Sequence, residues 1–133
     1  MIANYIGEYF PFVIIVVALG WIQFIYLFVG VAFNLLINLI LKNFFQAKRP
    51  IPNLHTDYGM PSGHSQMATF VTTLIYFHNF RLFLLSSFFC FVTFWQRIHF
   101  RHHFLSQVVV GATLGIILAL FYRWFYKKYL KNY

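Results

Sequence analysis

Apolar residues form runs long enough to cross a lipid bilayer along most of this chain, and no other feature restricts its fold as strongly. A helix spans the hydrocarbon core with roughly 20 consecutive apolar residues. Inside lipid, a helix also satisfies its backbone hydrogen bonds within one segment. Charged residues make up only 9% of the sequence, whereas a soluble domain carries about a quarter. We therefore predict an all-α fold, a polytopic membrane helical bundle with about five membrane-embedded helices, in a single domain over residues 1–133.

Helices are expected at about 4–20, 23–46, 62–79, 82–98 and 104–126. The first two come from one apolar run over residues 9–41, which is too long for a single perpendicular span at 1.5 Å per residue. Dividing this run near Gly20 gives two helices, and one long tilted helix is the alternative. In the last expected helix, Gly111 and Gly115 are four residues apart, which favours close packing against a neighbouring helix.

Polar residues gather where these helices meet one membrane face. The second helix ends, the third begins, the fourth ends and the fifth begins on that face. The third helix starts at Ser62, a good N-cap residue, and Gly63 leaves the first turn open to a ligand. Free N–H groups and the positive end of the helix dipole suit such a terminus to anions. The residues expected to converge there are Lys42, Arg49, Ser62, His64, Arg97 and His103.

The charge balance indicates an anionic partner. Ten Lys and Arg residues face only two acidic residues, Glu8 and Asp57. Phosphate or a lipid headgroup fits this excess better than nucleic acid, because the basic residues lie at the ends of membrane helices and not on one soluble face. With the candidate ligand cations set aside, the positive-inside rule places the polar cluster on the non-cytoplasmic side. The opposite, cytoplasmic face then receives Arg81, Arg123, Lys127, Lys128 and Lys131.

The polar cluster contains the groups for phosphoryl transfer without a metal. Lys42, Arg49 and Arg97 supply cations, arginine binding phosphate as a rigid fork and lysine as a point charge. His64 and His103 can hold or release a proton near neutral pH. No acidic cluster accompanies them, which argues against a Mg²⁺ site, and we expect neither a metal nor a cofactor. Two alternatives stay open: the cations could only contact lipid headgroups, or the histidines at positions 99, 102 and 103 could bind a metal. Without a metal, we interpret His99 and His102 as bystanders at the membrane interface.

Three motifs, in order, resemble the signature motifs of the type 2 phosphatidic acid phosphatase superfamily. They are Lys42-x6-Arg49-Pro50, Pro61-Ser62-Gly63-His64 and Arg97-x5-His103, and the resemblance covers residues 30–120. Within the superfamily, the chain looks most like dolichyldiphosphatase, a lipid pyrophosphatase of the endoplasmic reticulum. This finer resemblance is carried by Tyr58-Gly59-Met60, Ser65-Gln66 and His103-x2-Ser106-Gln107.

The resemblance implies a role for each motif residue. His103 would attack the terminal phosphorus and become phosphohistidine, and His64 would act as general acid and then as general base. The residues that would hold the transferred phosphate are Lys42, Arg49, Ser62, Gly63 and Arg97. The implied substrate is dolichyl or another polyprenyl diphosphate, bound from the surrounding membrane lipid. The implied place is the endoplasmic reticulum membrane with the site facing the lumen, and the sequence indicates no oligomeric state.

Two positions depart from the broad family pattern. Gln96 precedes the third-motif arginine where the family has serine, and Gln107 stands four residues after His103 where it has aspartate. At this helical spacing the Gln107 carbonyl oxygen can accept a hydrogen bond from His103 and orient it, although an amide stabilises imidazolium less than a carboxylate does. The dolichyldiphosphatase branch also carries glutamine there, which makes Gln107 a mark of that subfamily.

Two other functions remain open on the sequence. The first is a phosphatase for another lipid phosphate, such as phosphatidate, phosphatidylglycerophosphate or undecaprenyl diphosphate. The second is a catalytically silent membrane protein that binds a lipid phosphate. Gln107 in place of aspartate favours the silent binder, whereas the intact set of basic and histidine residues favours an enzyme.

Overall fold

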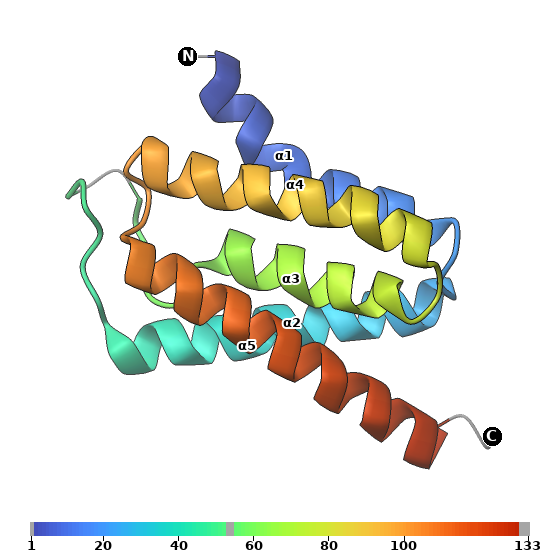
Figure 1. The fold of residues 1–133 in the computed structure, drawn as a ribbon. Coiled ribbons are helices and arrows are strands. Elements are labelled where there is room, and N and C mark those ends of the chain that lie inside the picture. Colours follow the sequence, from blue (N-terminus) through green and yellow to red (C-terminus); the bar gives the residue numbers. More distant parts are fainter. Residues whose placement is uncertain (1, 53–54, 131–133) are drawn as a thin grey trace.

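The computed structural model describes residues 2–52 and 55–130, without the side chains of residues 2–7. Within these ranges the chain forms α1 (Ile2–Leu19), α2 (Phe24–Phe45), α3 (Gly63–Tyr76), α4 (Phe80–His99) and α5 (Leu105–Phe125), and the π-helical turn η1 (Tyr126–Leu130) continues α5 (Figure 1). The expected all-α fold is confirmed, and each helix ends within three residues of its predicted bounds. Lys131, expected in the basic tail, lies outside the described residues.

The long apolar run at the start of the chain forms two helices, not one tilted helix. A turn at residues 20–23 separates α1 from α2, and the N–H groups of Trp21 and Ile22 donate to Ala18 O at 3.0 and 2.9 Å. Pro11 lies inside α1, where its ring removes an interior hydrogen bond and favours a bend. In Figure 1 the first turns of α1 tilt away from the bundle above α4.

Helix α3 lies at the centre of the bundle and contacts each of the other four α-helices (Figure 1). Residues 65–72 of this helix are all buried. Its Gln66 is paired with the polar stripe of α2: Gln66 Nε2 donates to Asn34 Oδ1 at 2.9 Å, and Asn38 Nδ2 donates to Gln66 Oε1 at 2.9 Å. Polar side chains inside a membrane bundle need such partners, so these amides hold α2 against α3.

The most extensive helix–helix interface lies between α3 and α5, where the two glycines of α5 allow the backbones to meet. A Cβ added at Gly111 would lie 2.5 Å from Ser62 O. One added at Gly115 would lie 2.3 Å from Gln66 O and would overlap the Thr69 hydroxyl. The Thr69 hydroxyl donates across this contact to Ala112 O at 2.9 Å. The predicted close packing at these glycines is confirmed, and it places the first turns of α3 and α5 side by side.

Among the described residues, three helices are long and apolar enough to cross a bilayer: α2, α4, and α5 together with η1. Helix α1 contributes the shorter apolar stretch Glu8–Leu19. Helix α3 has 14 residues and is about 21 Å long at 1.5 Å per residue, which is less than a full span. The predicted polytopic membrane bundle is confirmed, with α1 and α3 as its shorter members.

The glycine contact predicts the effect of a single methyl group. We expect Gly111→Ala to lower stability by about 1–3 kcal/mol, because the methyl group would be forced against the Ser62 backbone. Gly20→Ala is the matched control, since the nearest atom to its added Cβ is Val17 O at an ordinary 3.8 Å. Thermal unfolding of the detergent-solubilised variants measures both changes. Equal unfolding temperatures for the two variants would contradict the tight α3–α5 contact.

Candidate active site

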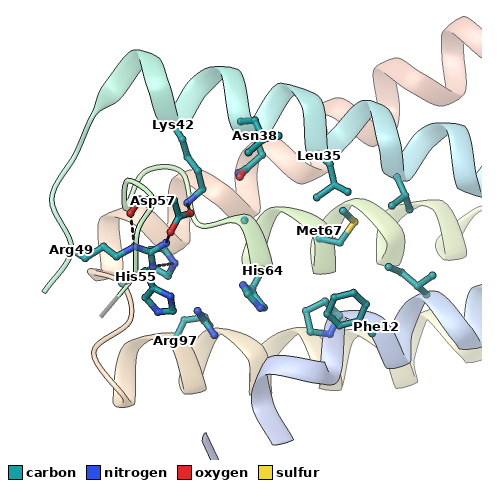
Figure 2. Close-up of a pocket in the computed structure, with 16 residues that line it drawn as sticks. Phe12, Leu35, Asn38, Lys42, Arg49, His55, Asp57, His64, Met67 and Arg97 are labelled. Atoms are coloured by element: carbon teal, nitrogen blue, oxygen red, sulfur yellow. Dashed lines mark hydrogen bonds and ion pairs between the residues drawn. The ribbon is translucent and has the colours of Figure 1, made fainter. Parts of the chain in front are cut away.

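A cavity of about 330 Å³ opens between the helices, and one of its ends is lined by the predicted cluster. Figure 2 shows Lys42, Arg49, His64 and Arg97 reaching this end from different elements. His103 and Gly63 also line it. The other end is apolar and is lined by side chains of α1, α2 and α3, among them Phe12, Leu35 and Met67. The cavity therefore joins a cationic chamber to an apolar groove.

Two of the three motif cations share one carboxylate. Lys42, buried one turn before the end of α2, donates from Nζ to Asp57 Oδ2 and to Tyr58 O, both at 2.6 Å. Arg49 donates from Nη2 to Asp57 Oδ1 at 2.6 Å and from Nε to Asp57 O at 3.1 Å. The loop that carries Asp57 therefore folds back over the end of α2 and brings both cations to one position.

The third cation, Arg97, lies in the last turn of α4 and is 1% exposed. Its Nη1 is 3.6 Å from Glu8 Oε1 of α1 and 3.3 Å from Gln96 Oε1. Its Nε has no hydrogen-bond partner within the described part of the chain. A buried, unpaired donor on a cavity-lining arginine is costly unless a ligand supplies the acceptor.

Gln107 contacts His103 across the i,i+4 spacing of the start of α5. Its Oε1 accepts from Phe104 N–H at 3.2 Å, and its Nε2 donates to Lys48 O at 2.7 Å. These two backbone partners determine which end of the amide is the oxygen. That oxygen lies 3.1 Å from His103 Nδ1, so Nδ1 carries the proton.

The opposite ring nitrogen of His103 is consequently free to accept. Arg49 Nη1 lies 3.0 Å from His103 Nε2, and a guanidinium can only donate. The lone pair of Nε2 therefore faces the cation that lines the cavity. This tautomer is the one that a nucleophilic Nε2 requires.

The surroundings of His103 keep its ring neutral. Burial, followed by the positive charges of Arg49 and Arg97, lowers the pKa of His103 to about 3. A neutral imidazole retains the nitrogen lone pair near neutral pH. The electrostatics of the cluster thus favour a nucleophile over an imidazolium.

The middle motif forms the start of α3. His64 lines the cavity from the first turn of the helix, and Figure 2 shows its ring on the same side as Arg97. Ser62 occupies the N-cap position, but its hydroxyl bonds to the Ser65 hydroxyl at 3.0 Å and makes no cap to the backbone. Ser62 is fully buried and lies outside the cavity lining, with its N–H donating to Gln107 O at 3.1 Å. The structure thus joins Ser62 to the α5 contact and not to the cavity.

Several residues near the cluster were not singled out by the sequence pattern. The clearest examples are Asp57 and Glu8. Because they are the only acidic residues beside ten Lys and Arg, the sequence could have indicated that they pair with the clustered cations. His102, interpreted from sequence as an interfacial bystander, is 3% exposed, and its Nδ1 lies 2.9 Å from His55 Nε2. That interpretation is wrong, because the turn before α5 folds the ring into the bundle.

Two other basic residues, His99 at the end of α4 and Arg101 in the turn before α5, are absent from the cavity lining. His99 is exposed and stacks on Trp95. Arg101 is exposed and has a φ of 56°. Among the described residues, no group of three His, Cys, Asp or Glu side chains is arranged to bind a metal ion.

Comparison with known proteins decides the family. The model of the PAP2 superfamily matches residues 23–131. The chain belongs to the PAP2 superfamily. The match includes all three motifs and the whole cavity except for its α1 side.

A curated relative and two solved structures resemble this PAP2 chain. Lipid phosphate phosphatase epsilon 2, chloroplastic, of Arabidopsis thaliana is 33% identical in an alignment of 98 residues that covers 63% of this chain. The chain spans about a third (33%) of that relative's length. The relative is a chloroplast protein, so the finer resemblance to dolichyldiphosphatase stays a proposal.

Both structural neighbours support the fold. The transmembrane PAP2 type phosphatidylglycerolphosphate phosphatase of Bacillus subtilis has a TM-score of 0.69 at 18% identity, covering 98% of this chain and 76% of the neighbour. LpxE of Aquifex aeolicus has a TM-score of 0.70 at 22% identity, covering 91% and 81%. At these identities the likeness concerns the arrangement of helices alone.

The low pKa of His103 predicts how stability depends on pH. In the unfolded chain the ring binds a proton below about pH 6.5, whereas in the folded chain it stays neutral down to a pH of about 3. Unfolding therefore takes up a proton between these values, and stability should fall as the pH falls from 6.5 toward 3. We expect the unfolding temperature to drop less between pH 7.5 and pH 5 in His103→Asn than in the wild type. The same drop in both proteins would show that His103 is not held neutral by its surroundings.

Proposed function

We propose that this PAP2-superfamily chain is a metal-independent lipid diphosphate phosphatase that removes the terminal phosphate of dolichyl or polyprenyl diphosphate through a phosphohistidine intermediate. The observation that carries the proposal is the state of His103: its Nε2 lone pair faces a cation-lined cavity while Gln107 holds the Nδ1 proton. The buried, unpaired Nε of Arg97 supports it, since a phosphate oxygen would supply the missing acceptor.

The geometry supports a two-step displacement. In the first step, His103 Nε2 attacks the terminal phosphorus and the bond from phosphorus to the bridging oxygen breaks. His64, which the negative charge of the bound diphosphate converts to imidazolium, gives its proton to that oxygen. In the second step, His64 takes a proton from water, the resulting hydroxide attacks phosphorus, and the phosphorus–nitrogen bond breaks. Inorganic phosphate leaves, and both histidines return to their starting states.

The cations supply electrostatic stabilisation in both steps. Lys42, Arg49 and Arg97 line one end of the cavity, where charge develops on the three equatorial phosphate oxygens. The Gly63 backbone at the start of α3 adds the positive end of the helix dipole. Ser62 would act only through the position of this turn, because its side chain lies outside the cavity lining.

The apolar end of the cavity supports a lipid substrate. Phe12, Leu35 and Met67 line a groove that leads away from the cations, and an isoprenoid or acyl chain would lie there. The isoprenoid diphosphate is preferred because residues 58–60, 65–66 and 106–107 resemble the dolichyldiphosphatase branch. We place the enzyme in the endoplasmic reticulum membrane with the site on the lumenal side, as the basic tail and this resemblance suggest.

A phosphatase for another lipid phosphate is the second candidate. It is favoured by the names of the similar proteins, which include a lipid phosphate phosphatase and a phosphatidylglycerolphosphate phosphatase. The silent lipid-phosphate binder is disfavoured by the tautomer of His103, since a site that only binds phosphate has no need of an unprotonated nitrogen directed at it.

Phosphate release from purified protein tests the function. We expect release from dolichyl diphosphate in the presence of EDTA, slower release from phosphatidate or dolichyl monophosphate, and none from His103→Asn. Fast release from phosphatidate alone would keep the mechanism and change the substrate. Release that EDTA abolishes would contradict the metal-free mechanism, and a folded wild type without release from any of these lipids would leave a silent binder.

Replacing Gln107 tests how His103 is positioned. Gln107→Leu removes the acceptor of the Nδ1 proton, and we expect kcat to fall on the order of 10²-fold or more with a smaller change in KM. Gln107→Glu keeps that acceptor but sets a carboxylate oxygen against Lys48 O, so it should retain more activity and unfold at a lower temperature. Equal kcat in Gln107→Leu and the wild type would rule out the positioning role.

A further inference from the structure

The only two acidic residues of the chain both lie against motif cations. Asp57 bridges Lys42 and Arg49, and Glu8 lies beside Arg97. Three cations are thus matched by two carboxylates before any phosphate arrives. In a sequence with ten Lys and Arg, both acidic side chains therefore contact cations that line one end of one cavity.

Asp57 occupies the position that an anionic ligand would take between Lys42 and Arg49. Its two carboxylate oxygens lie 2.6 Å from Lys42 Nζ and 2.6 Å from Arg49 Nη2, one oxygen on each cation. Figure 2 shows both contacts at the cationic end of the cavity that Asp57 helps to line. Two oxygens of a phosphate would make the same pair of contacts.

The Asp57 side chain is placed so that it can be displaced. It belongs to the loop between α2 and α3 and not to a helix, and it is 47% exposed, whereas Lys42 and Arg49 are 7% and 8% exposed. Partial burial alone would raise the pKa of Asp57, but the hydrogen bonds and charges of Lys42 and Arg49 outweigh it and lower this pKa. The carboxylate is therefore charged at neutral pH and holds its place by attraction to the two cations.

An incoming ligand must exchange with this carboxylate, and the exchange depends on charge. A phosphodiester, the form found in most membrane phospholipids, carries one negative charge, so it would only replace one monoanion by another. A terminal phosphate carries about −1.5 to −2 at pH 7 and gains additional attraction to both cations. The gain is large because Lys42 and Arg49 are shielded from water.

We propose that Asp57 is a specificity-determining residue, an internal counter-anion that a dianionic terminal phosphate displaces and a monoanionic phosphodiester does not. The proposal deepens the phosphatase function and rests on the cavity being its phosphate site. A membrane-embedded enzyme could in this way exclude the diester headgroups that surround it and still bind a rare terminal phosphate.

Binding of small anions tests the proposal without requiring turnover. The detergent-solubilised full chain is titrated at pH 8 with inorganic phosphate, a dianion there, and with dimethyl phosphate, a diester monoanion, with ³¹P NMR line broadening as the readout. The wild type should bind phosphate at least about tenfold more tightly than dimethyl phosphate. Asp57→Asn should bind dimethyl phosphate about tenfold more tightly than the wild type does, because no internal carboxylate then has to be displaced.

Glu8→Gln is the matched control. It removes one negative charge from the same cluster but leaves Asp57 between Lys42 and Arg49, so it should bind dimethyl phosphate as weakly as the wild type does. Thermal unfolding of each variant shows that it is folded. Weaker binding of either anion in folded Asp57→Asn, or the same tightening of dimethyl phosphate binding in Glu8→Gln, would overturn the proposal, as would a wild type that binds both anions equally or neither.

Failure of this proposal and failure of the proposed function give different results. Suppose that Asp57→Asn tightens the binding of dimethyl phosphate but the wild type releases no phosphate from any lipid; this result would contradict the enzyme and keep the role of Asp57 as counter-anion. An active wild type whose affinity for dimethyl phosphate is unchanged in Asp57→Asn would contradict the role of Asp57 alone.

Discussion

The close approach of α5 to α3 is the contact on which the rest of the site depends. Because Gly111 has no side chain, the α5 backbone reaches Ser62, whose N–H donates to Gln107 O at 3.1 Å. The same glutamine then binds Lys48 O with one end of its amide and His103 with the other. One helix contact thus aligns the middle motif, the loop after α2 and the candidate nucleophile.

Placing cations inside an apolar bundle is costly, and the structure offsets the cost in two ways. Lys42 and Arg49 share Asp57 and also bind backbone carbonyls, while Arg97 lies beside Glu8. Arg97 lines the cavity, and its Nε has no hydrogen-bond partner within the described residues. Such unsatisfied polar groups are expected where a ligand binds, because evolution retains them for function and not for stability.

The structure also gives a reason why residue 107 is glutamine and not an acidic residue. A carboxylate there could accept the His103 Nδ1 proton, but it could not donate to Lys48 O at 2.7 Å. Gly59 packs so tightly on this amide that an added Cβ would lie 2.6 Å from Gln107 Nε2. Glutamine therefore ties the loop after α2 to α5, a second task beyond orienting the ring, and this departure from the broad motif is matched by its surroundings.

The sequence by itself determined the helices, their approximate ends, the membrane environment and the set of basic and histidine residues that meet at one end. These follow from hydrophobic run length, proline and glycine positions and helical periodicity, all of which are local. Only the tertiary structure decided that Asp57 and Glu8 neutralise the cations, that His102 is buried and that the Ser62 hydroxyl caps no backbone group. Those outcomes depend on how loops fold across helices distant in sequence, and no local pattern encodes the distance between two charges brought together by packing.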